Sequence, residues 1–95
     1  MAKAMHDWTL VSILMDWQSA RVTINLQDHA STKTVVAEGV QDLRVPHECG
    51  WGPSVSVNEA YPIESLSTGL KRLRIEMQSG DVIEIVADEF DIPRN

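Results

Sequence analysis

Several segments of this chain alternate apolar and polar residues with a period of two, which places successive side chains on opposite faces of a β-strand. The alternation is clearest in residues 72–77 and 82–87, which a Gln-Ser-Gly-Asp turn connects. Glycine suits a tight turn because it readily takes a positive φ. We therefore predict a hairpin of these two strands, in which Arg72 or Arg74 lies opposite Glu84 as a cross-strand charge pair.

Five further segments carry strand signals: residues 10–17, 21–27, 35–39, 43–45 and 54–58. In the first of them, apolar side chains occupy both faces. One face carries Val11, Ile13, Met15 and Trp17, and the other carries Leu10 and Leu14. We therefore expect this strand to be central or covered on both sides, with Trp17 in the core. Gly39 is expected to mark a β-bulge.

Seven short strands separated by turn signals predict an all-β fold, either an antiparallel β-sandwich or a partly open β-barrel or roll. No window shows a sustained helical period, so we expect little or no helix beyond one turn around residues 63–66. A chain of 95 residues is long enough for one core and too short for two. We expect a single domain over residues 1–95, with residues 1–7 as a flexible N-terminus.

The charge balance disfavours two classes of partner. The chain carries 14 acidic and eight basic side chains, which give a formal net charge of −6. Nucleic-acid affinity depends largely on Lys and Arg contacts to phosphate, and anionic membranes recruit proteins through basic clusters. We therefore expect neither nucleic acid nor membrane as a partner, whereas a basic protein would be attracted.

Cysteine usage and the N-terminal segment point to the cytoplasm. Cys49 is the single cysteine, so no intrachain disulfide can form, which is typical of intracellular proteins. Residues 1–7 lack the apolar stretch of a secretory signal. The following run, residues 8–17, is too short to span a bilayer. We expect a cytoplasmic protein.

The residues most able to carry metal or thiol chemistry are His47 and Cys49, which lie two apart in a loop rich in glycine and proline. A zinc site needs three or four ligands, but the other histidines, His6 and His29, lie elsewhere in the sequence. A thiol enzyme needs an activating base and an oxyanion hole, and no pattern identifies them. We expect no catalytic residue, metal or cofactor, and we keep a small enzyme at His47 and Cys49 as the least favoured alternative.

Three tryptophans in so short a chain suggest a binding surface, since tryptophan is enriched at interaction hot spots. Trp51 lies between two glycines, where it fits either an exposed binding residue or a plug that closes the end of the fold. Trp8 fits either the core or the surface. The strand after Trp51 carries short polar side chains, and Asn58, Glu59 and Tyr61 follow. The candidate binding residues are therefore Trp51, Asn58, Glu59 and Tyr61, with Trp8 second.

Edge strands of a small β domain must be charged, covered or paired with another chain. The segment from Val55 to Val57 is sparsely charged. We therefore expect this segment to be the edge through which a homodimer would form.

Three stretches resemble small bacterial all-β domains: Met5 to Leu10, Trp51 to Glu59 and Ile75 to Ile83. Their style is similar to that of the small all-β immunity proteins that neutralise bacterial toxins. The resemblance implies a bacterial, cytoplasmic binding protein and transfers no active-site residue.

These observations favour a non-enzymatic protein-interaction domain that binds a basic, toxin-like protein. The alternative is a small-ligand or carbohydrate-binding β domain that uses the same polar and aromatic strip.

Overall fold

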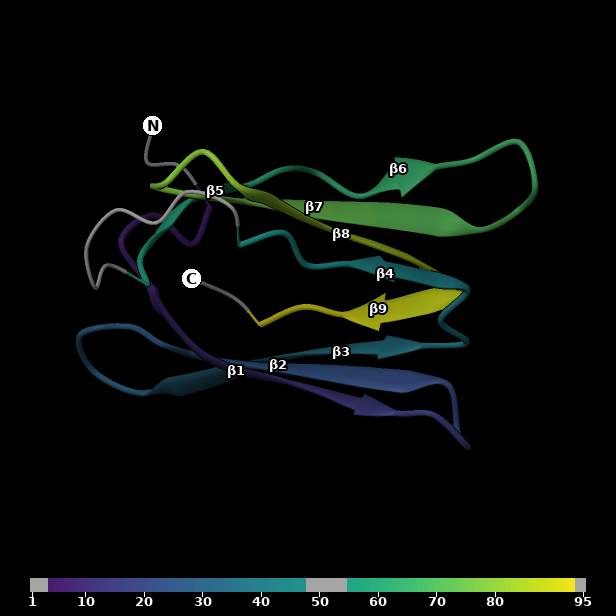
Figure 1. Cartoon of the computed structure of the whole chain (residues 1–95), viewed down its shortest axis with the longest axis horizontal. Helices are drawn as coiled ribbons and strands as arrows, with labels where there is room; N and C mark the ends of the chain where they lie inside the picture. The colour runs from purple at the N-terminus through teal and green to yellow at the C-terminus, as the bar shows by residue number, and fades with distance from the viewer. Residues whose placement is uncertain (1–3, 48–54, 94–95) are drawn as a thin grey trace.

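The computed structural model describes residues 4–47 and 55–93, which form two antiparallel β-sheets packed face to face (Figure 1). The strands are β1 (Thr9–Asp16), β2 (Arg21–Gln27), β3 (Thr32–Glu38), β4 (Asp42–Arg44), β5 (Val57–Ala60), β6 (Glu64–Ser65), β7 (Lys71–Met77), β8 (Val82–Ala87) and β9 (Glu89–Asp91). Sheet A has the order β1-β2-β3-β9, and sheet B has the order β4-β8-β7-β5, with β6 also paired to β7. The predicted antiparallel sandwich is confirmed.

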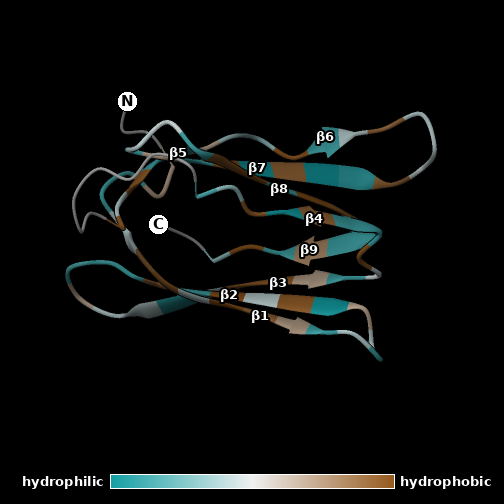
Figure 2. Ribbon diagram, in the orientation of Figure 1, coloured by the Kyte–Doolittle hydropathy of each residue, from teal (hydrophilic) through white to brown (hydrophobic). Residues whose placement is uncertain are grey.

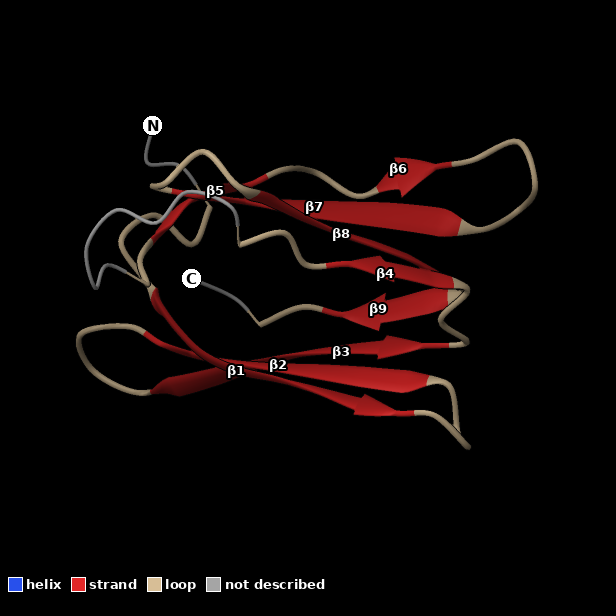
Figure 3. Ribbon diagram, viewed as in Figure 1, coloured by secondary structure: helices blue, strands red, loops and turns tan. Residues whose placement is uncertain are grey.

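Figure 3 shows only strands and loops in the described residues, which therefore contain no helix able to cross a membrane. The two sheets do not close into a barrel. Seven strands were expected and nine lie within the described residues; the two additional strands, β6 and β9, have only two and three residues. The helical turn expected around residues 63–66 is wrong, since Glu64 and Ser65 pair with β7 as β6.

The core lies between the inner faces of the two sheets, where alternate residues of four strands meet. Figure 2 shows the resulting alternation of apolar and polar residues along these strands. The inner-face side chains are buried: Val22, Ile24 and Leu26 on β2, Val35 and Ala37 on β3, Leu73 and Ile75 on β7, and Ile83, Ile85 and Ala87 on β8. Full burial of each large side chain contributes about 1.5–3 kcal/mol. The period-two pattern thus forms the core as the sequence predicts.

The hairpin of β7 and β8 is the element that the sequence predicts best. Arg74 lies opposite Glu84 in the register, as expected. The guanidinium groups of Arg72 and Arg74 also bind the Glu64 carboxylate, at 2.7 and 2.9 Å. The Arg72 hydrogen bond is the main cause that lowers the pKa of Glu64. These contacts hold β6 on β7.

The chain crosses between the sheets twice at one place. It leaves β3 for β4 through Gly39, and it leaves β8 for β9 through Asp88, whose backbone N–H donates to the carbonyl of Glu38. Gly39 has a φ of +67°, and a Cβ added there would overlap the Asp88 carboxylate. Glycine is therefore favoured where the two crossings pass each other, because any other residue would be strained and would displace the Asp88 side chain.

β1 differs from the expectation because it contains a β-bulge. Its register with β2 shifts between Leu10 and Ser12, so Val11 is an extra residue. Leu10 and Ile13, three positions apart, consequently both pack against the core. The expectation that β1 is central or covered on both sides is wrong, because β1 is an edge strand of sheet A and its Val11 and Leu14 are exposed.

Trp17 is exposed rather than buried, which corrects the prediction that it lies in the core. β1 ends at Asp16, so Trp17 belongs to the turn before β2 and no longer follows the strand alternation. Its exposed fraction is 84%. Trp8, by contrast, is buried in the core with an exposed fraction of 8%.

The Gly39→Ala variant should lower the free energy of unfolding by about 2–4 kcal/mol, because overlap with Asp88 adds to the strain of a positive φ. The matched control is Gly69→Ala. Gly69 has a φ of +88° with no atom within 4 Å of an added Cβ, so its cost should be about 1 kcal/mol. Urea unfolding of both variants measures the difference. Equal losses would show that the crossing is not tightly packed.

Candidate functional site

A strained turn precedes β1 and presents His6 and Asp7. Met5 and Asp7 have φ values of 60° and 67°, although neither is glycine. Each such residue costs about 1–3 kcal/mol and persists only where the surroundings hold it. The Met5 side chain is buried in the core, with an exposed fraction of 3%. Burial of Met5 therefore holds the turn, and His6 and Asp7 remain exposed on its outer side.

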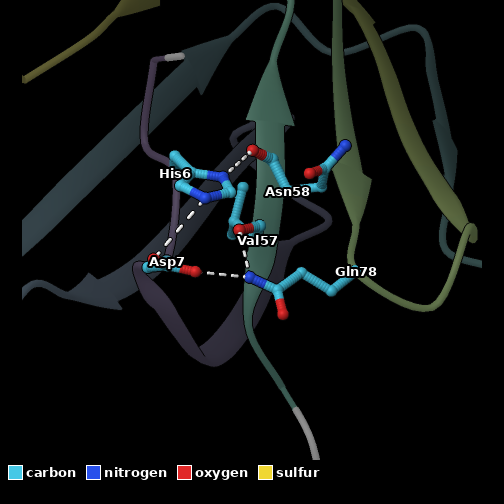
Figure 4. Close-up of polar contacts among 5 residues, drawn as sticks. All are labelled: His6, Asp7, Val57, Asn58 and Gln78. Carbon is cyan, nitrogen blue, oxygen red and sulfur yellow. Dashed lines mark hydrogen bonds and ion pairs between the residues drawn. The ribbon is translucent and has the colours of Figure 1, made fainter. Parts of the chain in front are cut away.

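The turn is hydrogen-bonded to β5 and so connects the two sheets. The Asp7 N–H donates to the Val57 carbonyl at 2.9 Å, and the Val57 N–H donates to the Trp8 carbonyl at 2.8 Å. Figure 4 shows the side-chain contacts beside them. His6 Nδ1 lies 2.8 Å from the Asn58 carbonyl oxygen. Because a carbonyl only accepts, Nδ1 carries the proton of this bond.

The end of β7 reaches the same turn through Gln78. Its side-chain amide donates to Asp7 Oδ1 at 2.6 Å and to the Val57 carbonyl at 3.4 Å (Figure 4). Its backbone N–H donates to the Ser56 carbonyl at 2.9 Å. Three segments that are distant in the sequence therefore meet at this end of the sandwich.

Glu76 is the centre of the neighbouring polar contacts. Its Oε1 accepts hydrogen bonds from Asn58 Nδ2 at 3.1 Å and from the Tyr61 hydroxyl group at 2.7 Å. Both of these donors are neutral groups. Glu59 lies opposite Glu76 in the register, where like charges repel. We call Asp7, Glu59 and Glu76 the acidic face.

Tyr61 connects the acidic face to an apolar pocket. The pocket has a volume of about 270 Å³ and is lined by Ala4, Met5, Ala60, Tyr61, Pro62, Ile63, Leu73, Ile92 and Pro93. The Arg74 guanidinium lies 5.5 Å from the centre of the Tyr61 ring, within the range of a cation–π contact. The hydrogen bond to Glu76 is the main cause that raises the pKa of Tyr61, because it stabilises the neutral hydroxyl group.

The predicted site residues fall in three groups. Asn58, Glu59 and Tyr61 lie together around Glu76. Trp8 lies in the core, beneath the turn that carries His6. Trp51 lies outside the described residues.

The residues considered for metal or thiol chemistry are not brought together in the described structure. His47 is exposed after β4, and Cys49 lies outside the described residues. Within residues 4–47 and 55–93, no group of three or more His, Cys, Asp or Glu side chains is placed to hold a metal ion.

Sequence reasoning missed Glu76 and Gln78 as parts of this site. Glu76 is one polar position in an alternating strand, so the pattern assigns it only to the solvent side of the sheet. Its pairing with β5 depends on a register shift between Val57 and Glu59. A single sequence carries no signal for that shift, so these contacts could not be predicted.

Comparison with known proteins finds no matching family model, no similar curated protein and no similar solved structure. The functional interpretation of this site therefore depends on its geometry and charge.

Tyr61 should ionise at a higher pH than an ordinary tyrosine, and Glu76→Gln should bring its pKa back toward the ordinary value. Since Tyr61 is the only tyrosine of the chain, tyrosinate absorbance during an alkaline titration reports this group alone. Because folding raises its pKa, the Tyr61 contribution to stability is present below the ordinary tyrosine pKa. It is lost as the pH rises through the raised value. An unchanged midpoint in Glu76→Gln would contradict the assigned hydrogen bond.

Proposed function

We propose that this chain is a non-enzymatic protein-interaction domain that binds a basic polypeptide on the acidic face and the adjoining pocket. The observation that carries the proposal is the position of Tyr61. Its ring lines an apolar pocket, and its hydroxyl group donates to a carboxylate of the acidic face. One partner segment can therefore place an apolar side chain in the pocket and a cationic side chain beside Glu76.

The charge of the acidic face supports a basic partner. Two other glutamates, Glu38 and Glu89, are also opposite each other in the register, but each forms an ion pair, with Arg21 and Lys71 respectively. Glu59, in contrast, forms no ion pair with any residue in the described ranges. A partner lysine or arginine would offset the repulsion between Glu59 and Glu76.

The chain as a whole also favours such a partner. Its net charge of −6 would steer a basic protein toward it at low ionic strength. A basic bacterial toxin is a partner of this class, as the resemblance to immunity proteins suggests. The single cysteine, which is typical of intracellular proteins, favours the cytoplasm as the place of this interaction.

The pocket favours a second candidate function, the binding of a small ligand. Its volume of about 270 Å³ is close to the lower end of the range for ligand sites. Methionine, isoleucine, leucine and proline dominate its lining, which suits an apolar ligand better than a carbohydrate.

A short peptide of lysine and leucine should bind the acidic face, and NMR titration of the labelled protein locates the contact. We expect the largest amide shifts at Asp7, Glu59, Tyr61 and Ile63, with affinity that falls as salt is added. A peptide with glutamate in place of lysine is the control and should not bind. Equal responses to both peptides, or shifts confined to other strands, would contradict the proposal.

Charge reversal tests the same surface by mutation. Glu59→Lys should weaken binding of the lysine–leucine peptide by roughly tenfold at low salt. Glu89→Lys makes the same change of charge on β9 of sheet A and should leave affinity close to that of the parent chain.

A small apolar ligand that shifts the amide signals of the pocket residues alone would support the second candidate function, the binding of a small ligand.

A further inference from the structure

β1 exposes more apolar surface than a monomer of this size would be expected to leave in water. The exposed fractions are 59% for Val11, 59% for Leu14, 38% for Met15 and 84% for Trp17, in the turn that follows. Scattered exposed apolar residues are ordinary, but these four follow one another along a single edge strand and its turn, which is typical of an interaction site. This surface is independent of the acidic face, which lies on sheet B and the N-terminal turn.

The outer edge of β1 also lacks the usual protection of an edge strand. The last contact on this edge is the Leu10 N–H, which donates to the Val55 carbonyl at 2.8 Å. Beyond it, no described residue pairs with the outer edge of β1. Residues 11–15, Val-Ser-Ile-Leu-Met, carry neither charge nor proline. Such an edge is a template for strand pairing with another chain.

The other sheet edges are protected by charge or by pairing. β9 carries Glu89 and Asp91, and β4 carries Asp42 and Arg44. The segment from Val55 to Val57, which was expected to be the dimer edge, already bonds to the N-terminal turn and to Gln78. β1 is therefore the edge that the described structure leaves open to pairing.

We propose that two copies of this chain pair antiparallel through β1, about a two-fold axis at Leu14, and so join their A sheets into one eight-stranded sheet. Antiparallel pairing must bring side chains of the same face together. Ile13 and Met15 lie opposite the buried Ile24 and Val22, so they belong to the inner face. Ser12, Leu14 and Asp16 belong to the outer face.

With the axis at Leu14, each side chain of the strand lies opposite a side chain of similar or complementary polarity in the partner. Leu14 packs against the partner's Leu14, and Ile13 against the partner's Met15. The Ser12 hydroxyl group can donate to the carboxylate of the partner's Asp16. An axis at Ile13 would instead place Ser12 opposite leucine and leave the Asp16 carboxylate opposite Leu10. Of these two registers, only the one about Leu14 gives every position a compatible partner, which argues for a second copy as the occupant.

The same register gives Trp17 an apolar contact. It places Trp17 beside the partner's Val11. The partner's Val55 is close by, because it bonds to Leu10 at the end of the unpaired part of the edge. Val55 is itself 44% exposed. Pairing about Leu14 thus brings together the exposed apolar side chains of the strand and of the turn that follows it.

Sedimentation equilibrium of the purified chain tests the proposal. We expect a dimer whose fraction rises with protein concentration. Leu14→Lys places two like charges on the axis and should raise the dissociation constant at least about 100-fold. The control Val45→Lys replaces another exposed apolar residue, 47% exposed, and should leave the dimer unchanged. Circular dichroism should show both variants folded, because both side chains are already in contact with water.

A cysteine cross-link tests the register, since directly opposite Cβ atoms in an antiparallel pair lie about 4.5–5.5 Å apart. In a Cys49→Ser background, Leu14→Cys should form a disulfide-linked dimer on mild oxidation, and Val45→Cys should not. A chain that stays monomeric at high concentration overturns the proposal, even if β1 binds some other polypeptide. A dimer that Leu14→Lys leaves intact overturns it as well.

Discussion

The packing of two apolar sheet faces against each other is the interaction on which the rest of this structure depends. The side chains of β2 and β3 meet those of β7 and β8, and nearly all of the fully buried volume lies between them. Each sheet alone would expose one apolar face. The crossings at Gly39 and Asp88 and the docking of the N-terminal turn are possible because this core holds the two sheets together.

The N-terminal turn and β1 differ in how their sheet edges are covered. The turn at Met5 to Asp7 has an unfavourable backbone, and the burial of Met5 and the hydrogen bonds to β5 offset its cost. The turn covers the β5 edge of sheet B. The rest of β1 has no such cover. The covered edge carries the polar contacts around Asn58 and Glu76, and the open edge carries apolar side chains. The two surfaces therefore suit partners of different chemistry.

The sequence predicts this fold where both strands of a pair alternate regularly, as in the hairpin of β7 and β8. The sequence-based prediction fails where one extra residue shifts the alternation of inward and outward side chains along a strand. The bulge at Val11 puts Leu10 on the same inner face as Ile13, and the early end of the strand leaves Trp17 in water. At the site, the polar character of Asn58 and Tyr61 was predictable. Their common partner, Glu76, depends on a register that a single sequence does not encode locally.

The double crossing also affects the order in which the chain can fold during synthesis. Ala37 pairs with Phe90, and every strand of sheet B lies between them in the sequence. A ribosome must therefore produce β4 to β8 before sheet A can acquire its fourth strand. Until then, β3 offers an unpaired edge that other nascent chains can occupy. Non-local pairing of this kind is slow to form, so β9 is expected to join sheet A late in folding.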